Sequence, residues 1–437
     1  MTTRIELDGG ALALVESSHA VPIVTIIVAF RSGAAHDPVG REGIARFTAR
    51  MLRRGAGGMT ARAIEDALDR LGGEMSVDAT ASTLLVHTQV IGRNVDAFVD
   101  LLAKLLAEPD FPEDELARLR RESLAELVEI RDNDRAVAQI AFRCGLFAGH
   151  PYGRPTSGTE ASLSAIGESD ARDFYRTHLT RANLVVGFAG DVTAARAAEL
   201  GARLAGALPA GARPADHVGP PTAKPGQRLL FVDKPERTQT QIVVGSLGTW
   251  PHDDDHMAIT VANGVLGGTF TSRLMREVRS KRGWSYGASS RLTIDRQRHS
   301  FQMWTFPAAA DAAACLELEL GLLNDFVNDG IQADELAFIQ SYLSRSYAFE
   351  IDTAAKRMHQ AADVELLGLP PRYYDDHVAT VRAVTLAEAN ASIARRIDPR
   401  SLLIVVLGTA RDILEPIKER IPSLDAVEVV PFDADFG

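Results

Sequence analysis

Histidine and aspartate recur at a spacing suited to metal binding in one segment, TWPHDDDHMA at residues 249–258. His252 and His256 stand four residues apart with Asp255 between them, so on a helix both imidazoles would point the same way. A zinc site also requires a third protein ligand, and none occurs at a suitable spacing. Pro251 and the aspartates are typical of the start of a helix, where carboxylates complement the helix dipole. We therefore expect a structural role, with an unrelated metal site as the alternative.

A cationic pair lies in the stretch GIARFTARMLRRG, residues 43–55. Apolar side chains from Ile44 to Leu52 recur at helical spacing, which predicts an amphipathic helix. Arg46 and Arg50 lie four residues apart on another face of that helix. A guanidinium stays protonated at any working pH and offers no lone pair, so these side chains are suited to anions and not to metals. The simplest interpretation is a solvated face.

The length, net charge and cysteine content of the chain restrict the classes of function. The chain has 437 residues, enough for two or three domains, and its net charge of −11 argues against nucleic acid as a partner. The two cysteines, Cys144 and Cys315, form no CxxC pair, so we expect neither a disulfide framework nor a cysteine-zinc site. The N-terminal residues have no apolar signal core, and no run is long enough to span a membrane. We expect a soluble cytoplasmic chain without membrane contacts; the periplasm is the alternative if a leader was removed.

The chain repeats itself. The segment FPEDELARLRRESLAELVEIRDN at position 111 parallels IQADELAFIQSYLSRSYAFEIDT at position 331, an offset of 220 residues. A second pair of segments, beginning at positions 171 and 389, matches at an offset of 218 residues. Each pair is typical of a long helix, or of a helix followed by a buried strand. Two matches at nearly the same offset predict a duplicated domain, because this period is too long for a solenoid.

A linker separates the two copies. Residues 211–228, GARPADHVGPPTAKPGQR, are rich in Pro and Gly and lack periodicity. We therefore predict an N-terminal domain over residues 1–210 and a C-terminal domain over residues 229–437. Each half begins with strand-like runs, such as PIVTIIVAF and TQIVVGSL, and continues with helices. Strands and helices that are grouped in this way favour an α+β fold over strict βαβ alternation.

With the duplication, the chain resembles the M16 metallopeptidases, the family of insulin-degrading enzyme, pitrilysin and mitochondrial processing peptidase, and among them the heterodimeric bacterial type. The resemblance covers essentially the whole chain, and its most specific part is GTFTSRLMREVRSKRGWSYGASS, residues 268–290. FRSGAAHDPVGREGIARFTARML and FPEDELARLRRESLAEL are similar to the family's active-site helix and third-ligand helix. The resemblance implies two homologous domains, each an antiparallel β-sheet packed with helices, that form half of a clamshell.

The family's zinc motif is degenerate in this sequence. Active members carry HxxEH, two imidazoles that bind zinc and a glutamate base, with a third ligand on a later helix. The matching pentapeptide is RFTAR, so Arg46 and Arg50 replace both histidines and Ala49 replaces the base, while the third-ligand position falls on Glu126. The resemblance therefore implies no metal in this chain and zinc in a partner subunit. We expect an arginine to replace the charge of the missing metal and to pair with Glu126.

A second element of the family is preserved. In active members an Arg and a Tyr seven residues apart, in the half without zinc, hold the substrate carbonyl and its oxyanion. Arg279 and Tyr286 are the matching residues. Gly283 between them fits the end of a helix, so we expect Arg279 near a helix C-terminus and Tyr286 on the next strand. Donors preorganised toward developing negative charge are often the largest catalytic contribution.

One segment of the first half is similar to the family strand that pairs with an extended substrate, GGEMSVDATAS at residues 72–82. The usual pattern has asparagine and alanine where Ser76 and Val77 stand. An edge strand can still accept a peptide through its backbone groups, because β-addition needs no particular side chain. We expect an edge strand here.

Taken together, these features predict a non-catalytic, zinc-lacking subunit of a two-chain zinc metalloendopeptidase. A zinc-bearing M16-like partner would supply the metal and the base, in a heterodimer or a larger assembly. This chain would be inactive alone and would supply Arg279, Tyr286 and half of a chamber that encloses a peptide. The alternative is a catalytically inert scaffold or peptide-binding protein, as in family members built into respiratory complexes. Whether the partner is another gene product or a second copy remains open.

Overall fold

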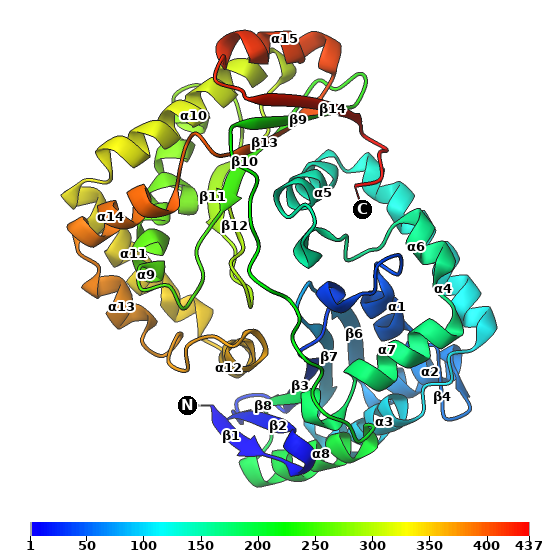
Figure 1. Ribbon diagram of the computed structural model, residues 1–437. Coiled ribbons are helices and arrows are strands. Elements are labelled where there is room, and N and C mark those ends of the chain that lie inside the picture. The colour runs from blue at the N-terminus through cyan, green and yellow to red at the C-terminus, as the bar shows by residue number, and fades with distance from the viewer. Residues whose placement is uncertain (1, 437) are drawn as a thin grey trace. The chain divides into compact units, whose positions relative to one another are not determined.

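The computed structural model describes residues 2–436 and contains two six-stranded sheets with helices packed on them (Figure 1). The chain divides into two compact units. Unit 1 consists of Met1–Leu127, Arg154–Val218 and Ala348–Tyr374, and unit 2 consists of Val128–Gly153, Gly219–Tyr347 and Asp375–Gly437. Neither unit is continuous in sequence.

The sheet of unit 1 has the order β1-β2-β8-β3-β7-β6. Its strands are β1 (Thr3–Glu6), β2 (Leu12–Ser17), β3 (Ile23–Phe30), β6 (Gly73–Ala79), β7 (Leu84–Ile91) and β8 (Leu184–Gly190). All neighbours are antiparallel except β2 and β8, which run parallel. The segment expected to be an edge strand is β6, at the end of the sheet.

The sheet of unit 2 repeats this arrangement except at its outer strand, which follows the other five in the chain instead of preceding them. Its order, read from the outer strand, is β14-β9-β13-β10-β12-β11. The strands are β9 (Arg228–Asp233), β10 (Gln241–Leu247), β11 (Ala288–Leu292), β12 (Ser300–Thr305), β13 (Leu403–Gly408) and β14 (Ala426–Pro431). Strand β9 is parallel to both β13 and β14, and the other neighbours are antiparallel. The two-domain α+β fold was therefore predicted correctly, but each sheet is mixed rather than purely antiparallel.

Helices cover both sheets. Unit 1 contains α1 (Ile44–Met51), α2 (Ala61–Leu71), α3 (Val95–Ala107), most of α4 (Glu113–Asp132), α6 (Glu160–Ala165), α7 (Glu168–His178), α8 (Ala194–Ala207) and α12 (Ala354–Leu367). Unit 2 contains α5 (Asp134–Leu146), α9 (His256–Asn263), α10 (Ala312–Asp329), most of α11 (Ala333–Glu350), α13 (His377–Ala383), α14 (Leu386–Arg396) and α15 (Ala410–Arg420), with π-helical segments η6 (Gly264–Gly268) and η7 (Met275–Ser280).

Shorter elements complete the chain. A two-stranded ribbon joins β4 (Gly55–Ala56) and β5 (Met59–Thr60). Single 3₁₀ turns are η1 (Asp8–Gly10), η2 (Ala34–His36), η3 (Gly92–Asn94), η4 (Pro151–Gly153), η5 (Arg181–Asn183) and η8 (Ala309–Asp311). The Pro- and Gly-rich segment predicted as a linker, 211–228, is without regular structure until β9 begins at its last residue.

Each unit includes a helix from the other half of the sequence. Helix α12 packs on β2 and β8 of unit 1, whereas α5 packs on β10 and β13 of unit 2. Gly187 on β8 allows α12 to approach closely, because a Cβ at this position would lie 2.2 Å from the Sδ of Met358. The two helices occupy equivalent places in the repeat, so their exchange leaves no trace in the sequence pattern. The domain boundaries that the sequence repeat predicted, 1–210, 211–228 and 229–437, remain predictions.

The core of unit 1 lies on both faces of its sheet. Along β3, Ile26 and Val28 pack into the main core, whereas Ile27 and Ala29 pack beneath α12. This two-sided burial explains the nearly continuous apolar run of β3, since a strand covered on only one face would alternate apolar and polar residues.

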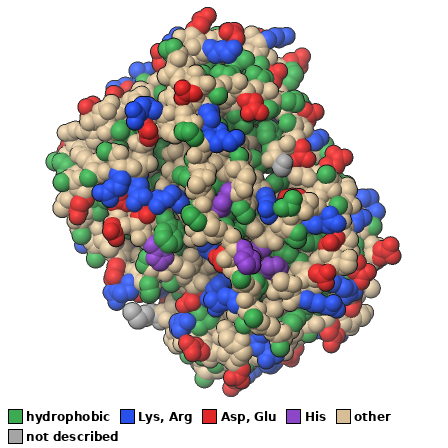
Figure 2. Space-filling view, in the orientation of Figure 1, with side chains coloured by type: hydrophobic (Ala, Val, Ile, Leu, Met, Phe, Trp, Pro, Cys, Tyr) green, Lys and Arg blue, Asp and Glu red, His purple; other side chains and the backbone are tan. Residues whose placement is uncertain are grey.

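The surface carries both signs of charge. Figure 2 shows acidic and basic side chains interspersed over the face that is drawn. Among residues 2–436, no helix is both long and apolar enough to cross a bilayer.

A fully buried carboxylic acid, Glu319 on α10, makes the stability of unit 2 dependent on pH. Burial raises the pKa of Glu319 to about 7 from 4.5, although contacts with Thr305 and Cys315 oppose the shift. The folded chain therefore binds this proton more tightly than the unfolded chain, and the resulting stabilisation is complete below pH 4.5 and lost as the pH rises toward about 7. We expect Glu319→Gln to raise the melting temperature relative to the wild type by a few degrees more at pH 8 than at pH 5.

Thermal melts at the two pH values check this expectation. Asp325→Asn, an exposed position on the same helix, is the control and should behave as the wild type does. A melting-temperature difference between Glu319→Gln and the wild type that does not change with pH would contradict it.

Candidate functional site

The start of helix α1 is fixed by Asp37 and Gly43. The Asp37 carboxyl group accepts hydrogen bonds from the backbone N–H of Gly43 at 2.6 Å and of Ala45 at 3.1 Å. Gly43 has φ of 90°, and a Cβ there would lie 2.9 Å from the backbone of Gly158, so only glycine suits this position. Burial raises the pKa of Asp37 to about 8, although the two backbone hydrogen bonds oppose the shift. The helix therefore begins at Ile44, as the sequence pattern predicted.

Helices α1 and α4 bring opposite charges together. Helix α1 buries its apolar face in the core of unit 1 and directs Arg46 and Arg50 toward α4. Helix α4 is 20 residues long, and its carboxylates at i, i+7 and i+11 lie on one face. These carboxylates are Glu115, Glu122 and Glu126.

Both arginines of the degenerate motif bind Glu126. Arg50 donates from Nη2 to Oε1 at 2.7 Å and from Nη1 to Oε2 at 3.1 Å, which is a bidentate pair. Arg46 Nη1 donates to the same Oε2 at 2.9 Å. The pairing that the sequence predicted is thus present, with two guanidiniums rather than one. The three side chains remain 20–33% exposed, so the pair is partly open to water.

The ion pairs continue along α4. Arg54 donates to Glu122 at 2.5 Å and to Glu115 at 3.1 Å, and Arg118 contacts both of these carboxylates. Burial opposes ionisation of Glu122, but the hydrogen bonds from Arg54 outweigh it and lower its pKa. Burial likewise opposes ionisation of Glu126, but hydrogen bonds from Arg50 and then Arg46 outweigh it and lower its pKa. Glu122 and Glu126 are therefore ionised near neutral pH.

This donor set does not fit a zinc ion. Both oxygens of Glu126 already accept hydrogen bonds from guanidiniums, and Arg46 and Arg50 have no lone pair to donate to a metal. Ala49, at the position of the general base, is fully buried and has no group that transfers protons. Within residues 2–436, no three side chains of His, Cys, Asp or Glu form a group that could hold a metal.

The second candidate element, in unit 2, is an arginine between two exposed aromatic rings. The guanidinium carbon of Arg279 lies 4.3 Å from the ring centre of Tyr286 and 4.7 Å from that of Phe270. Tyr286 is 76% exposed and Phe270 is 71% exposed. Nη1 of Arg279 is shielded from solvent, yet it has no hydrogen-bond partner among the described residues. Stacking therefore fixes the plane of the guanidinium and leaves donors at its edge for an acceptor.

The backbone around this arginine follows the prediction in part. Arg279 lies on η7, and Gly283 ends this helical segment with φ of 67° and an N–H bond to the Arg279 carbonyl at 3.0 Å. Tyr286 was predicted on the next strand, but it lies in the loop two residues before β11. The hydroxyl of Ser285 accepts the N–H of Phe306 and donates to Gly287, which replaces strand pairing there. The Tyr286 ring is consequently exposed instead of half-buried in the sheet.

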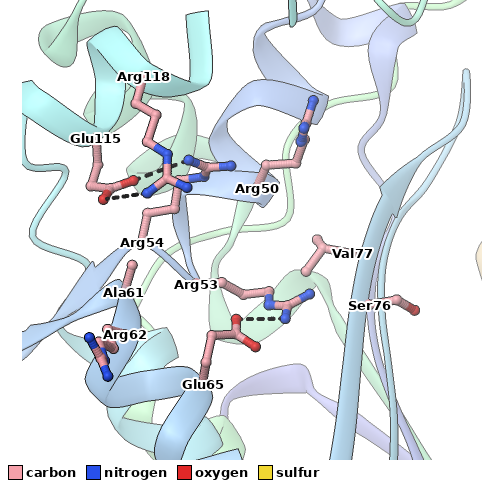
Figure 3. Close-up of a pocket in the computed structure, with 10 residues that line it drawn as sticks. All are labelled: Arg50, Arg53, Arg54, Ala61, Arg62, Glu65, Ser76, Val77, Glu115 and Arg118. Carbon is pink, nitrogen blue, oxygen red and sulfur yellow. Dashed lines mark hydrogen bonds and ion pairs between the residues drawn. The ribbon is translucent and has the colours of Figure 1, made fainter. Parts of the chain in front are cut away.

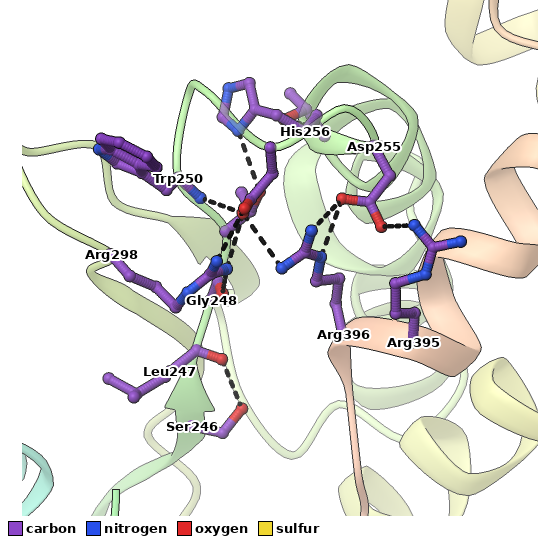
Figure 4. A network of polar contacts seen from close by, with 12 residues as sticks. Ser246, Leu247, Gly248, Trp250, Asp255, His256, Arg298, Arg395 and Arg396 are labelled. Atoms are coloured by element: carbon purple, nitrogen blue, oxygen red, sulfur yellow. Dashed lines mark hydrogen bonds and ion pairs between the residues drawn. The ribbon is translucent and has the colours of Figure 1, made fainter. Parts of the chain in front are cut away.

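The histidine segment is the start of a helix. His256 begins α9, is buried, and contacts Thr249 Oγ1 through Nδ1 at 3.2 Å (Figure 4). Burial lowers the pKa of His256 to about 4. Asp255 bonds to Arg396 at 2.5 Å and to Arg395 at 3.0 Å, so its oxygens are occupied by guanidiniums. The structural interpretation of this segment therefore fits better than a metal site.

Sequence reasoning missed several members of both groups. Phe270 lies two residues after the glycine pair at 267 and 268, and only the fold places its ring against Arg279. The carboxylates Glu115 and Glu122 could have been found from their spacing, since they share a helix face with Glu126.

Comparisons with known proteins bear on the family and the fold of the chain. The family model described as "Insulinase (Peptidase family M16)" matches residues 12–160, and the one described as "Peptidase M16 inactive domain" matches residues 165–343. The chain is 26% identical over 415 residues to an uncharacterized zinc protease of Mycobacterium bovis, covering 93% of this chain and 92% of that protein. It is 22% identical over 398 residues to a non-peptidase homolog of Helicobacter pylori, covering 91% of each.

Solved structures share the fold. A crystal structure of a peptidase M16 inactive domain from Pseudomonas fluorescens superposes with a TM-score of 0.87 at 24% identity, covering 93% of this chain and 98% of that one. A protease from Helicobacter pylori superposes with a TM-score of 0.82 at 17% identity, covering 93% and 99%. At this level of identity the similarity shows the fold alone.

Proposed function

Because the chain belongs to peptidase family M16 and has lost the family's zinc motif, we propose that it is the non-catalytic subunit of a two-chain zinc metalloendopeptidase. The partner in this proposal is an M16 chain with an intact HxxEH motif and the distant glutamate. That partner holds zinc, which supplies the activated water, and the general base. The present chain supplies Arg279, Tyr286 and half of the chamber that encloses the peptide.

The proposal rests on the contrast between Arg46 and Arg50 in unit 1 and Arg279 in unit 2. Arg46 and Arg50 saturate Glu126, so the first group is closed to a metal. Arg279, in contrast, retains a shielded nitrogen without a hydrogen-bond partner among the described residues, beside the exposed ring of Tyr286. An inert scaffold has no use for such a preorganised donor.

In this proposal the two side chains of unit 2 act on the substrate, not on a metal. The N–H groups of Arg279 bind the carbonyl oxygen of the peptide bond that is cleaved. The Tyr286 hydroxyl donates a hydrogen bond to the same oxygen as negative charge develops on it. Both groups are positioned before the reaction, so little reorganisation accompanies charge development, which is the condition under which such donors accelerate a reaction most.

Reconstitution tests the proposal. The purified chain is mixed with an HxxEH-bearing M16 chain from the same genome, and cleavage of a fluorogenic peptide library is measured together with bound zinc. We expect each chain alone to be essentially inactive, the mixture to cleave, and about one zinc ion per heterodimer. Robust cleavage by the homogeneous single chain, abolished by a chelator and restored by zinc, would contradict the proposal.

The rival function is a scaffold or peptide-binding protein without a catalytic task. The name of the Helicobacter pylori relative, a non-peptidase homolog, favours considering it. The two functions differ at Arg279 and Tyr286, because a scaffold would tolerate their substitution without any change in a partner's turnover.

A further inference from the structure

We propose that the groove beside the degenerate zinc motif is a carboxylate-binding site for an acidic, extended peptide. The groove has a volume of about 590 Å³ and lies within unit 1, between α1, α2, α4 and β6 (Figure 3). We call it the arginine groove after the five arginines that line it: Arg50, Arg53, Arg54, Arg62 and Arg118.

Positive charge is in excess around this groove although the chain as a whole is acidic. The carboxylates at the groove are Glu65, paired with Arg53, and Glu115, paired with Arg54 and Arg118. With Glu122 and Glu126 behind them and Arg46 beside them, six guanidiniums face four carboxylates. Among the described residues Arg62 forms no ion pair within 4 Å, so it is the cation most available to a ligand. Because the whole chain carries a net charge of −11, this local positive excess is distinctive.

Guanidiniums favour carboxylates as ligands of such a groove. Each presents five N–H donors in a planar fork that matches the two oxygens of a carboxylate. Arg53 donates from Nη1 to the Met75 carbonyl and from Nη2 to Glu65, and these contacts hold its guanidinium beside the groove. The groove is therefore rich in hydrogen-bond donors and lacks the electron-pair donors that a metal needs.

The adjacent edge strand favours a peptide over a small anion. Arg53 Nη1 donates to the carbonyl of Met75 on β6 at 2.6 Å, so that carbonyl points away from β7. Outward and inward backbone groups alternate along an antiparallel edge, which directs the N–H and C=O of Val77 outward as well. Val77 lines the groove. A peptide strand paired there would place every second side chain on the groove side.

The arginine groove would bind the peptide that the partner cleaves, and in this one respect the inference rests on the proposed function. Binding itself requires neither zinc nor a partner. The test therefore uses the purified single chain, so that a failure here is distinguishable from a failure of reconstitution.

Fluorescence anisotropy measures the binding of a fluorescein-labelled peptide with Glu at alternate positions and of a matched peptide with Gln instead. We expect the Glu peptide to bind at least about tenfold more tightly, and less tightly at high salt, because charged hydrogen bonds provide the difference. Arg62→Gln should weaken binding of the Glu peptide by about tenfold and leave the Gln peptide unaffected. Arg70→Gln, an exposed arginine on the same helix outside the groove, is the matched control.

A third peptide, with the Glu sequence and N-methylated alternate amides, tests the contribution of the edge strand and should bind more weakly. Equal affinities for the Glu and Gln peptides would overturn the proposal. The proposal would also be overturned if inorganic phosphate displaced the Glu peptide at concentrations at which chloride does not and N-methylation had no effect. The groove would then bind free anions instead of a peptide strand. Reconstituted cleavage with no preference for acidic peptides would leave the proposed function intact and exclude only this specificity.

Discussion

Replacing Arg279 by alanine is expected to lower kcat/KM of the reconstituted two-chain peptidase by about 100- to 1000-fold, mostly through kcat. The reason is geometric. Arg279 is held between the rings of Phe270 and Tyr286, so the plane of its guanidinium is fixed before an oxyanion forms. Steady-state kinetics with saturating partner chain check the result. Arg279→Lys should restore only part of the rate, because a lysine keeps the charge but not the planar fork.

Two further variants separate catalysis from folding. Arg276→Ala, on the same helical segment but paired with Glu277, should leave turnover nearly unchanged. Tyr286→Phe should lower kcat while keeping the stacking contact, because only the hydroxyl is lost. If Arg279→Ala and Tyr286→Phe both cleave at the wild-type rate in a complex that still assembles, the chain is a scaffold and the catalytic role in trans is wrong.

Replacing Glu126 by alanine is expected to lower the free energy of unfolding by about 1–3 kcal/mol, because it leaves Arg46 and Arg50 without their shared carboxylate. The effect should be smaller than for a fully buried ion pair, since water reaches these side chains. Chemical denaturation followed by circular dichroism measures it. The matched control is Glu129→Ala, an exposed position one turn further along α4, which should change stability little.

The ion pair of Glu126 also predicts how the stability of the chain changes with pH. The pKa of Glu126 is lowered in the folded chain, because the arginine hydrogen bonds outweigh the effect of burial. Its stabilisation is therefore present above the unfolded pKa of 4.5 and is lost as the pH falls through the lower folded value. The difference in stability between wild type and Glu126→Ala should accordingly shrink in acid. A stability difference that is absent at neutral pH would show that the pair contributes nothing.

Much of the fold could be predicted because residue types and their spacing within short segments indicate it. The repeat at an offset of 220 residues predicted two equivalent domains, and the two sheets share one strand order apart from the outer strands β1 and β14. Periodicity predicted the helices that became α1 and α4, and the family resemblance predicted the edge strand that became β6. Arg46, Ala49 and Arg50 excluded zinc by residue type alone, since no conformation gives a guanidinium a lone pair.

Other features depend on contacts between residues far apart in the chain. Arg46 and Glu126 are separated by 80 residues, so only the tertiary structure shows that both arginines share one carboxylate. The exposure of Tyr286 follows from the hydrogen bond between Ser285 and Phe306 across a hairpin. Neither contact can be inferred from the residues of one segment alone.

The amino-acid sequence by itself determined the duplication, the α+β class and the chemical incompetence of the motif at Arg46–Arg50, because each is a property of residue types and their local spacing. The tertiary structure alone decided the exchange of α5 and α12 between the units, the stacking of Arg279 between two rings, and the arginine groove beside β6. The physical reason is that equivalent helices carry equivalent apolar patterns, and a side chain's type states which contacts it favours but not which distant partner the fold will bring to it.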